Sequence, residues 1–109
     1  MAIPIGVMPR FACGELHLTN CARDVLQRHR TEVKQCFCRH LNGDWGDVKP
    51  AVWVANSNAL QFGGRLLSGY LISRKTRLVI ITESDRSTTT LYVGDECPSS
   101  VHWSDFLSH

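Results

Sequence analysis

Three strand-like runs separated by short linkers limit the folds that this chain can adopt. The runs RLLSGYLI, RLVIIT and TTTLYV cover residues 65–72, 77–82 and 88–93, and the linkers between them are SRKT and ESDRS. Their apolar and β-branched residues, together with linkers of turn length, predict an antiparallel meander. Because VIIT is apolar at consecutive positions, both faces of the middle strand need cover, so we expect it to be central and packed under helices.

The first half of the chain supplies the helices. A strand is predicted over residues 10–18, followed by helices over 21–30, 31–41 and 49–62, where apolar residues recur at helical spacing. The order therefore predicts an α+β fold. Two or three helices pack on a small antiparallel sheet that combines the N-terminal strand with the C-terminal three-stranded meander.

Capping residues predict where the helices begin. Thr19 or Asn20 offers a side-chain oxygen to the first helix, Thr31 to the second and Asp47 to the third. A glycine pair at 63–64 predicts the end of the third helix.

The length of 109 residues fits a single domain, 1–109. Residues 94–109 read as a tail with two open interpretations. The tail is either loosely attached or docked through Trp103 and Phe106.

Charge and cysteine content narrow the compartment and the partners. The formal net charge of +2 gives no general attraction to nucleic acid, and no run approaches the length of about 20 apolar residues that spans a membrane. The five cysteines are an odd number and no signal peptide precedes them, so we expect a reduced, cytoplasmic protein whose cysteines pack as small hydrophobic residues.

The segment CFCRH contains three side chains of the kind that bind zinc, namely Cys36, Cys38 and His40. On a helix, however, Cys38 points away from the face that Cys36 and His40 share, so the three cannot converge on one ion. We therefore expect packing rather than a metal site, and no cofactor.

Two turns carry carboxylates, Asp44 and Asp47 in the first and Glu83 and Asp85 in the second. If both turns lie at one edge of the sheet, the four groups could form a partner-binding surface or bind a divalent cation. The alternative is that the aspartates bond their own turns and that Glu83 and Asp85 pair with nearby arginines.

Basic residues gather over the first two predicted helices, where they form either a solvated face or a surface for nucleic acid. They are Arg23, Arg28, Arg30, Lys34 and Arg39. Neither a nucleophile elbow nor a phosphate-binding loop is present, so no catalytic residue is assigned.

The runs HLNGDWGDV, NxxALxxGGRLLSxY and ITExDRSxTTxL span residues 40–91, about half of the chain. Together they resemble a family of small bacterial plasmid-related or mobile-element proteins of unknown function. The resemblance implies a bacterial, plasmid- or phage-borne origin but brings no known active site. The chain departs from the family pattern in its number of cysteines and in its tail.

Small proteins of this kind often disable a host defence by binding it. The leading hypothesis is therefore a stoichiometric inhibitor of an anti-CRISPR or anti-restriction type, which binds a bacterial protein or ribonucleoprotein complex. The alternatives are a nucleic-acid-binding accessory protein and a small metal-dependent hydrolase of nucleic acids or nucleotides. The predicted partner-binding residues are Asp44, Trp45, Asp47, Glu83, Asp85 and Arg86.

Overall fold

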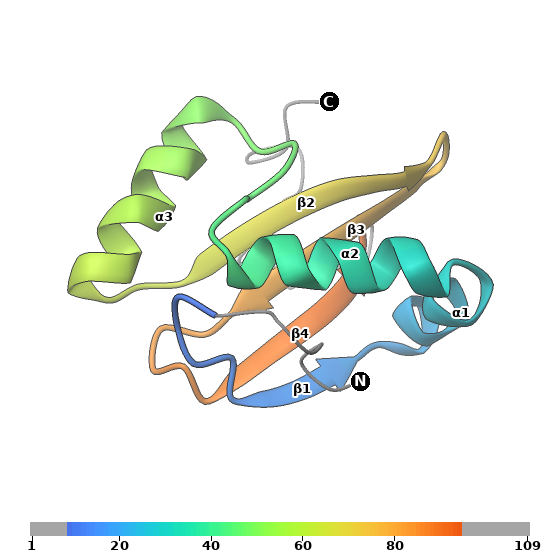
Figure 1. The fold of residues 1–109 in the computed structure, drawn as a ribbon, viewed down its shortest axis with the longest axis horizontal. Helices are drawn as coiled ribbons and strands as arrows, with labels where there is room; N and C mark the ends of the chain where they lie inside the picture. Colours follow the sequence, from blue (N-terminus) through green and yellow to red (C-terminus); the bar gives the residue numbers. More distant parts are fainter. Residues whose placement is uncertain (1–8, 95–109) are drawn as a thin grey trace.

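The computed structural model describes residues 9–94, which form three helices and a four-stranded sheet (Figure 1). The α+β class is confirmed. The proposed tail lies almost entirely outside the described residues. In chain order the elements are β1 (Glu15–Leu18), α1 (Asn20–Arg28), α2 (Arg30–Leu41), α3 (Pro50–Phe62), β2 (Leu66–Ser73), β3 (Thr76–Thr82) and β4 (Thr88–Val93).

The sheet has the strand order β1-β4-β3-β2. The meander of β2, β3 and β4 is antiparallel, as predicted. The expectation of an antiparallel N-terminal strand is wrong, because β1 pairs with β4 in parallel, so the sheet is mixed. β1 is also shorter than predicted, since Gly14 has a positive φ of 65° that interrupts extended backbone just before it.

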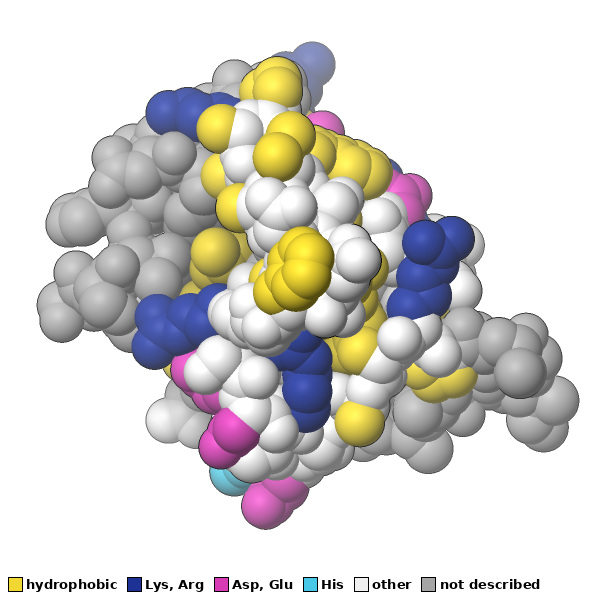
Figure 2. Space-filling view, turned by 90° about the vertical axis from the view of Figure 1, so that its left-hand side faces the viewer, with side chains coloured by type: hydrophobic (Ala, Val, Ile, Leu, Met, Phe, Trp, Pro, Cys, Tyr) yellow, Lys and Arg dark blue, Asp and Glu magenta, His cyan; other side chains and the backbone are white. Residues whose placement is uncertain are grey.

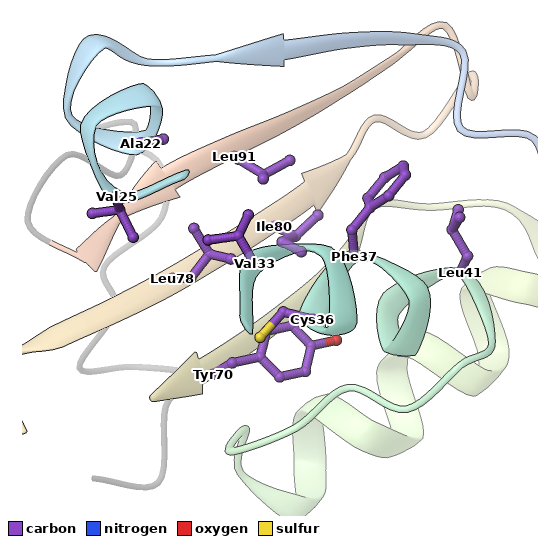
Figure 3. Close-up of a cluster of buried hydrophobic side chains, with 10 residues drawn as sticks. All are labelled: Ala22, Val25, Val33, Cys36, Phe37, Leu41, Tyr70, Leu78, Ile80 and Leu91. Carbon is purple, nitrogen blue, oxygen red and sulfur yellow. The ribbon is translucent and has the colours of Figure 1, made fainter. Parts of the chain in front are cut away.

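β3 is central, and its residues from Leu78 to Thr82 are all buried, which confirms the prediction for this strand. Alternate residues of the sheet face α1 and α2. They form one apolar cluster with the inner sides of these helices (Figure 3). Val25 of α1 and Val33 and Phe37 of α2 lie in this cluster with Leu78 and Ile80.

Only one of the three expected helix caps is present. The Thr19 hydroxyl accepts the backbone N–H of Ala22 at 3.1 Å and so caps α1, as predicted. Thr31 lies inside α2, whose cap is His29, and Asp47 precedes a helix whose cap is Lys49. Neither cap residue makes a side-chain hydrogen bond that caps its helix, so both predictions were wrong. Within residues 9–94, no helix is long and apolar enough to cross a membrane.

Candidate functional site

The segment GDWGD lies along the outer edge of β2. The backbone N–H of Gly69 donates to the Trp45 carbonyl at 3.1 Å, and the N–H of Asp47 donates to the Gly69 carbonyl at 2.7 Å. Gly46 between them has φ 73°, and a Cβ built on it would lie 2.2 Å from the Gly69 oxygen. Only glycine permits this close approach, so the segment acts as a short additional strand that partly covers the edge of the sheet.

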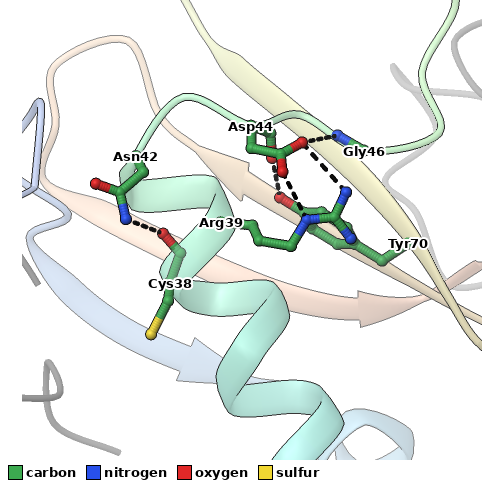
Figure 4. Close-up of polar contacts among 6 residues, drawn as sticks. All are labelled: Cys38, Arg39, Asn42, Asp44, Gly46 and Tyr70. Atoms are coloured by element: carbon green, nitrogen blue, oxygen red, sulfur yellow. Dashed lines mark hydrogen bonds and ion pairs between the residues drawn. The ribbon is translucent and has the colours of Figure 1, made fainter.

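Asp44, near the start of this segment, forms an ion pair with Arg39 (Figure 4). The Arg39 guanidinium donates to both carboxylate oxygens, at 2.8 and 3.2 Å, and the N–H of Gly46 donates to one of them. The Arg39 hydrogen bonds are the main reason that the pKa of Asp44 is lowered. Arg39 also stacks on the ring of Tyr70, whose hydroxyl donates to the Asp44 carbonyl at 2.7 Å. These contacts tie α2 to β2.

Trp45 is a core residue. It is 1% exposed, stacks with Phe11 at a ring-centroid distance of 6.2 Å and meets His40 edge-to-face at 5.4 Å. It also belongs to a second apolar cluster that includes Ala59 of α3 and Leu66 of β2. Trp45 was predicted to bind a partner, but its indole fills the space between the helices and the sheet and is not exposed to a partner in this conformation.

Arg86 joins three parts of the fold. Its guanidinium donates to the carbonyls of Ala59 at 2.9 Å, Gly64 at 2.6 Å and Glu83 at 3.1 Å. The residue has φ 61°, a conformation that is rare outside glycine and that directs its side chain toward the end of α3. The fork of donors suits several carbonyls at once, so Arg86 has a structural role here.

The other two members of the second turn are also engaged within the chain. Arg65 donates to the Glu83 carboxylate at 3.0 Å, and the Asp85 carboxylate accepts the N–H of Ser87 at 2.9 Å. Hydrogen bonds from Ser87 lower the pKa of Asp85. The expectation that Glu83 pairs with a nearby arginine is confirmed, whereas Asp85 bonds its own turn instead of the arginine that was expected for it.

The two acidic turns do not form one cluster. The first lies against Gly69 in the middle of β2, whereas the second follows Thr82, which pairs with Leu66 at the beginning of that strand. Among residues 9–94, no group of three or more His, Cys, Asp or Glu side chains is placed to hold a metal ion. The predicted approach of four carboxylates was therefore wrong, and the hydrolase hypothesis loses its proposed site. The assignment of Asp44, Asp47, Glu83 and Asp85 to a partner surface remains a prediction.

A chain of hydrogen bonds surrounds His40 in the interior. His40 is 0% exposed, its Nδ1 lies 2.6 Å from the Ser68 hydroxyl and its Nε2 lies 2.8 Å from the Thr82 hydroxyl. Thr82 is 2.7 Å from the Thr89 hydroxyl, which donates to the Cys13 carbonyl at 2.7 Å. The chain connects α2 with three strands and the segment before β1.

The directions of these hydrogen bonds follow from Thr89 and from the charge state of His40. A hydroxyl has one proton, and Thr89 gives its own to the Cys13 carbonyl, so Thr82 must donate to Thr89. Thr82 therefore accepts from Nε2–H of His40. Because burial lowers the pKa of His40, the ring is neutral, so Nδ1 carries no proton and accepts from Ser68. His40 is thus the neutral Nε2–H tautomer, in a network where every polar atom has a partner.

Ser68 and His40 are side chains of the kind that serve as nucleophile and base in hydrolases, but here they are closed to solvent. Burial, with a smaller effect of the Arg86 charge, lowers the pKa of His40 to about 3. Ser68 and His40 are both fully buried, so no substrate reaches them in this conformation. The apolar stripe of Val33, Phe37 and Leu41 could have indicated the burial of His40, which lies beside it on α2.

Cys13, Cys36 and Cys38 form no disulfide within residues 9–94. Cys36 is buried, and burial raises its pKa to about 11, which keeps it as an unreactive thiol. Cys38 and His40 do not converge with it on a metal site within residues 9–94. Cys97 lies outside the described residues.

The outward face of α3 is a surface that was not predicted from the sequence. This helix has no charged residue, and it exposes Trp53, Val54 and Phe62 by 38%, 62% and 78%. Seen from this side, hydrophobic side chains form a band over the helix, and Lys and Arg side chains stand around it (Figure 2). The signal in the sequence was that PAVWVANSNALQF has no charged residue on any side. A helix that buries one face needs to lack charge only on that face.

A scan of protein-family models, a search of curated proteins and a search of solved structures each found no match to this chain.

Proposed function

We propose that this chain is a binding protein that inhibits a bacterial defence complex by occupying one of its protein surfaces. We further propose that the α3 face is the contact. The α3 face comprises the exposed residues Trp53, Val54, Ser57, Asn58, Gln61 and Phe62. In this proposal the protein acts without turnover in the cytoplasm of the bacterial host. The mobile-element origin remains a prediction from the sequence resemblance.

The observation that carries the proposal is the exposure of large apolar side chains on a helix without charge. The chain has twelve Lys and Arg residues, yet none lies in the 13 residues of α3. The centres of protein interfaces are depleted in charge and enriched in aromatic residues, and a compact exposed apolar patch marks such a surface. The partner surface that fits is an apolar, uncharged groove on another protein.

The proposal is tested with a triple variant, Trp53→Ser, Val54→Ser and Phe62→Ser, and a control variant, Leu71→Ser. Leu71 is also an exposed apolar residue, at 47%, but lies on β2. Bacteria with an active CRISPR or restriction system express each protein, and the plating efficiency of a targeted phage is measured. We expect wild type and the control to raise plating efficiency and the triple variant to lose this effect, with all melting temperatures similar.

Two outcomes contradict different parts of the proposal. If the wild-type protein raises phage plating efficiency in none of the CRISPR and restriction systems tested, the inhibitor function is wrong. If the triple variant inhibits as well as wild type does, the inhibitor function stands but the α3 face is not its contact.

A further inference from the structure

We propose a second, independent binding surface, for the phosphate backbone of nucleic acid, at the end of the molecule opposite α3. This surface is the basic end, made of six exposed cations on α1, α2 and the β2–β3 hairpin. They are Arg23, Arg28, Arg30, Lys34, Arg74 and Lys75.

Packing brings these elements to one end. Val25 of α1 and Val33 of α2 share an apolar cluster with Ile72 and Leu78, which flank the turn of the hairpin. In Figure 1 the α1–α2 corner and the β2–β3 hairpin both lie on the right, and α3 lies on the left. The hairpin is more than forty residues from the corner in sequence, so the helices account for only four of the six cations of this surface.

These cations are available for an external ligand. The ion pairs His17–Glu15, Arg39–Asp44 and Arg65–Glu83 do not involve the basic end. The same elements carry two acidic residues, Asp24 and Glu32, so cations remain in excess there. Arg39 belonged to the basic face expected from the sequence, but its pairing with Asp44 and its stacking on Tyr70 exclude it from the basic end.

The net charge of the whole chain hides this excess. Three of its ten acidic residues, Asp95, Glu96 and Asp105, lie outside the described part, whereas all twelve Lys and Arg residues lie within it. Residues 9–94 therefore carry five more cations than anions. The total of +2 underestimates the local attraction that the folded part exerts on an anion.

The spacing of the cations favours a ligand with many phosphates. They are spread over three elements instead of converging on one point, as they would around a single phosphate group. A membrane surface is less suitable, because such surfaces combine cations with several apolar side chains that insert. Among the exposed large hydrophobic residues of the described chain, only Leu71 lies outside α3.

The test measures binding of a fluorescent 20-base-pair DNA duplex and of the matching RNA duplex at several salt concentrations. If four to six cations each neutralise a phosphate, the slope of log K against log salt is about −4 to −5 on duplex DNA. Two double variants divide the surface, Arg28→Gln with Arg30→Gln on the helices and Arg74→Gln with Lys75→Gln on the hairpin. Each should weaken binding by roughly tenfold at low salt and reduce the slope by about 2.

The matched control is Arg10→Gln with Lys49→Gln, which removes two positive charges away from the basic end. At an ionic strength of about 0.1 M it should leave the affinity within about twofold of wild type, since the screening length of about 10 Å confines the attraction to nearby charges. The proposal is overturned if the control weakens binding as much as the two double variants do, or if only one of these two has an effect. It is also overturned by absence of binding at low salt, or by tighter binding to vesicles of anionic lipid. None of these results bears on the α3 face.

Discussion

The interior of this protein contains a histidine, His40, that fits its surroundings only as the neutral imidazole. His40 is fully buried, and its two nitrogens are fixed by Ser68 and Thr82 in one direction of donation. Protonation of Nδ1 would place a positive charge in a core that already has the Arg86 guanidinium nearby. The residue that sequence analysis considered as a metal ligand therefore acts as an internal connector.

We predict a loss of stability in mild acid that depends on His40. Its pKa of about 3 in the folded state lies below the ordinary value of 6.5, so the unfolded chain binds more protons between these values. Stability is thus fully present above pH 6.5 and falls as the pH decreases toward 3, by at most about 5 kcal/mol. Urea unfolding at several pH values measures this dependence.

The controls are His40→Gln and His17→Gln. His40→Gln should lower stability at neutral pH and remove most of the pH dependence above pH 4, whereas exposed His17 should leave the wild-type dependence intact. An unchanged pH dependence in His40→Gln would contradict the prediction.

Gly46 is the second residue whose identity the fold dictates. We predict that Gly46→Ala lowers the free energy of unfolding by at least about 2 kcal/mol, because the new Cβ has both a strained φ and a clash with the Gly69 carbonyl. Gly63→Ala separates the two effects, since φ is 93° there but nothing lies within 4 Å of the Cβ. A larger loss for Gly63→Ala than for Gly46→Ala in urea unfolding would refute this account.

At the scale of elements, the motifs that suggested a binding site serve mainly to connect helices and strands. The GDWGD segment joins α2 to β2, and Arg86 joins the β3–β4 turn to the end of α3. Local uses of these residues were predictable, because the Asp85–Ser87 bond depends only on neighbours in sequence. The contact between Arg86 and Ala59 was not, since it links residues brought together only by packing.

We predict that Arg86→Lys destabilises the fold by about 1–3 kcal/mol, because a compact ammonium cannot reach three carbonyls at once. Arg65→Lys is the matched control, since Arg65 makes an exposed pair with Glu83 whose loss costs less than about 1 kcal/mol. Chemical denaturation of the two variants compares them directly. Equal losses would mean that the carbonyl contacts of Arg86 contribute little.

At the scale of the whole molecule, the hydrophobic pattern predicted the class of fold and the central position of β3. This was possible because apolar residues recur along a helix or strand with the spacing of its buried face. The parallel pairing of β1 left no such signal, since a four-residue edge strand has the same alternation in either direction. The α3 face was not predicted, and the basic end was predicted only in its helical part, for related reasons. One depends on which side of a helix stays uncovered, and the other on a hairpin placed next to a helical corner.

The pairing of β1 with β4 has a consequence for how the chain is made. Leu18 meets Leu91, so β1 is synthesised before the strand with which it pairs. At synthesis rates of about 5–20 residues per second, this interval lasts roughly 4–15 seconds. Until β4 is made, β1 has no strand to pair with. A chain that stops before residue 88 therefore lacks the strand that joins β1 to the β2–β3 hairpin.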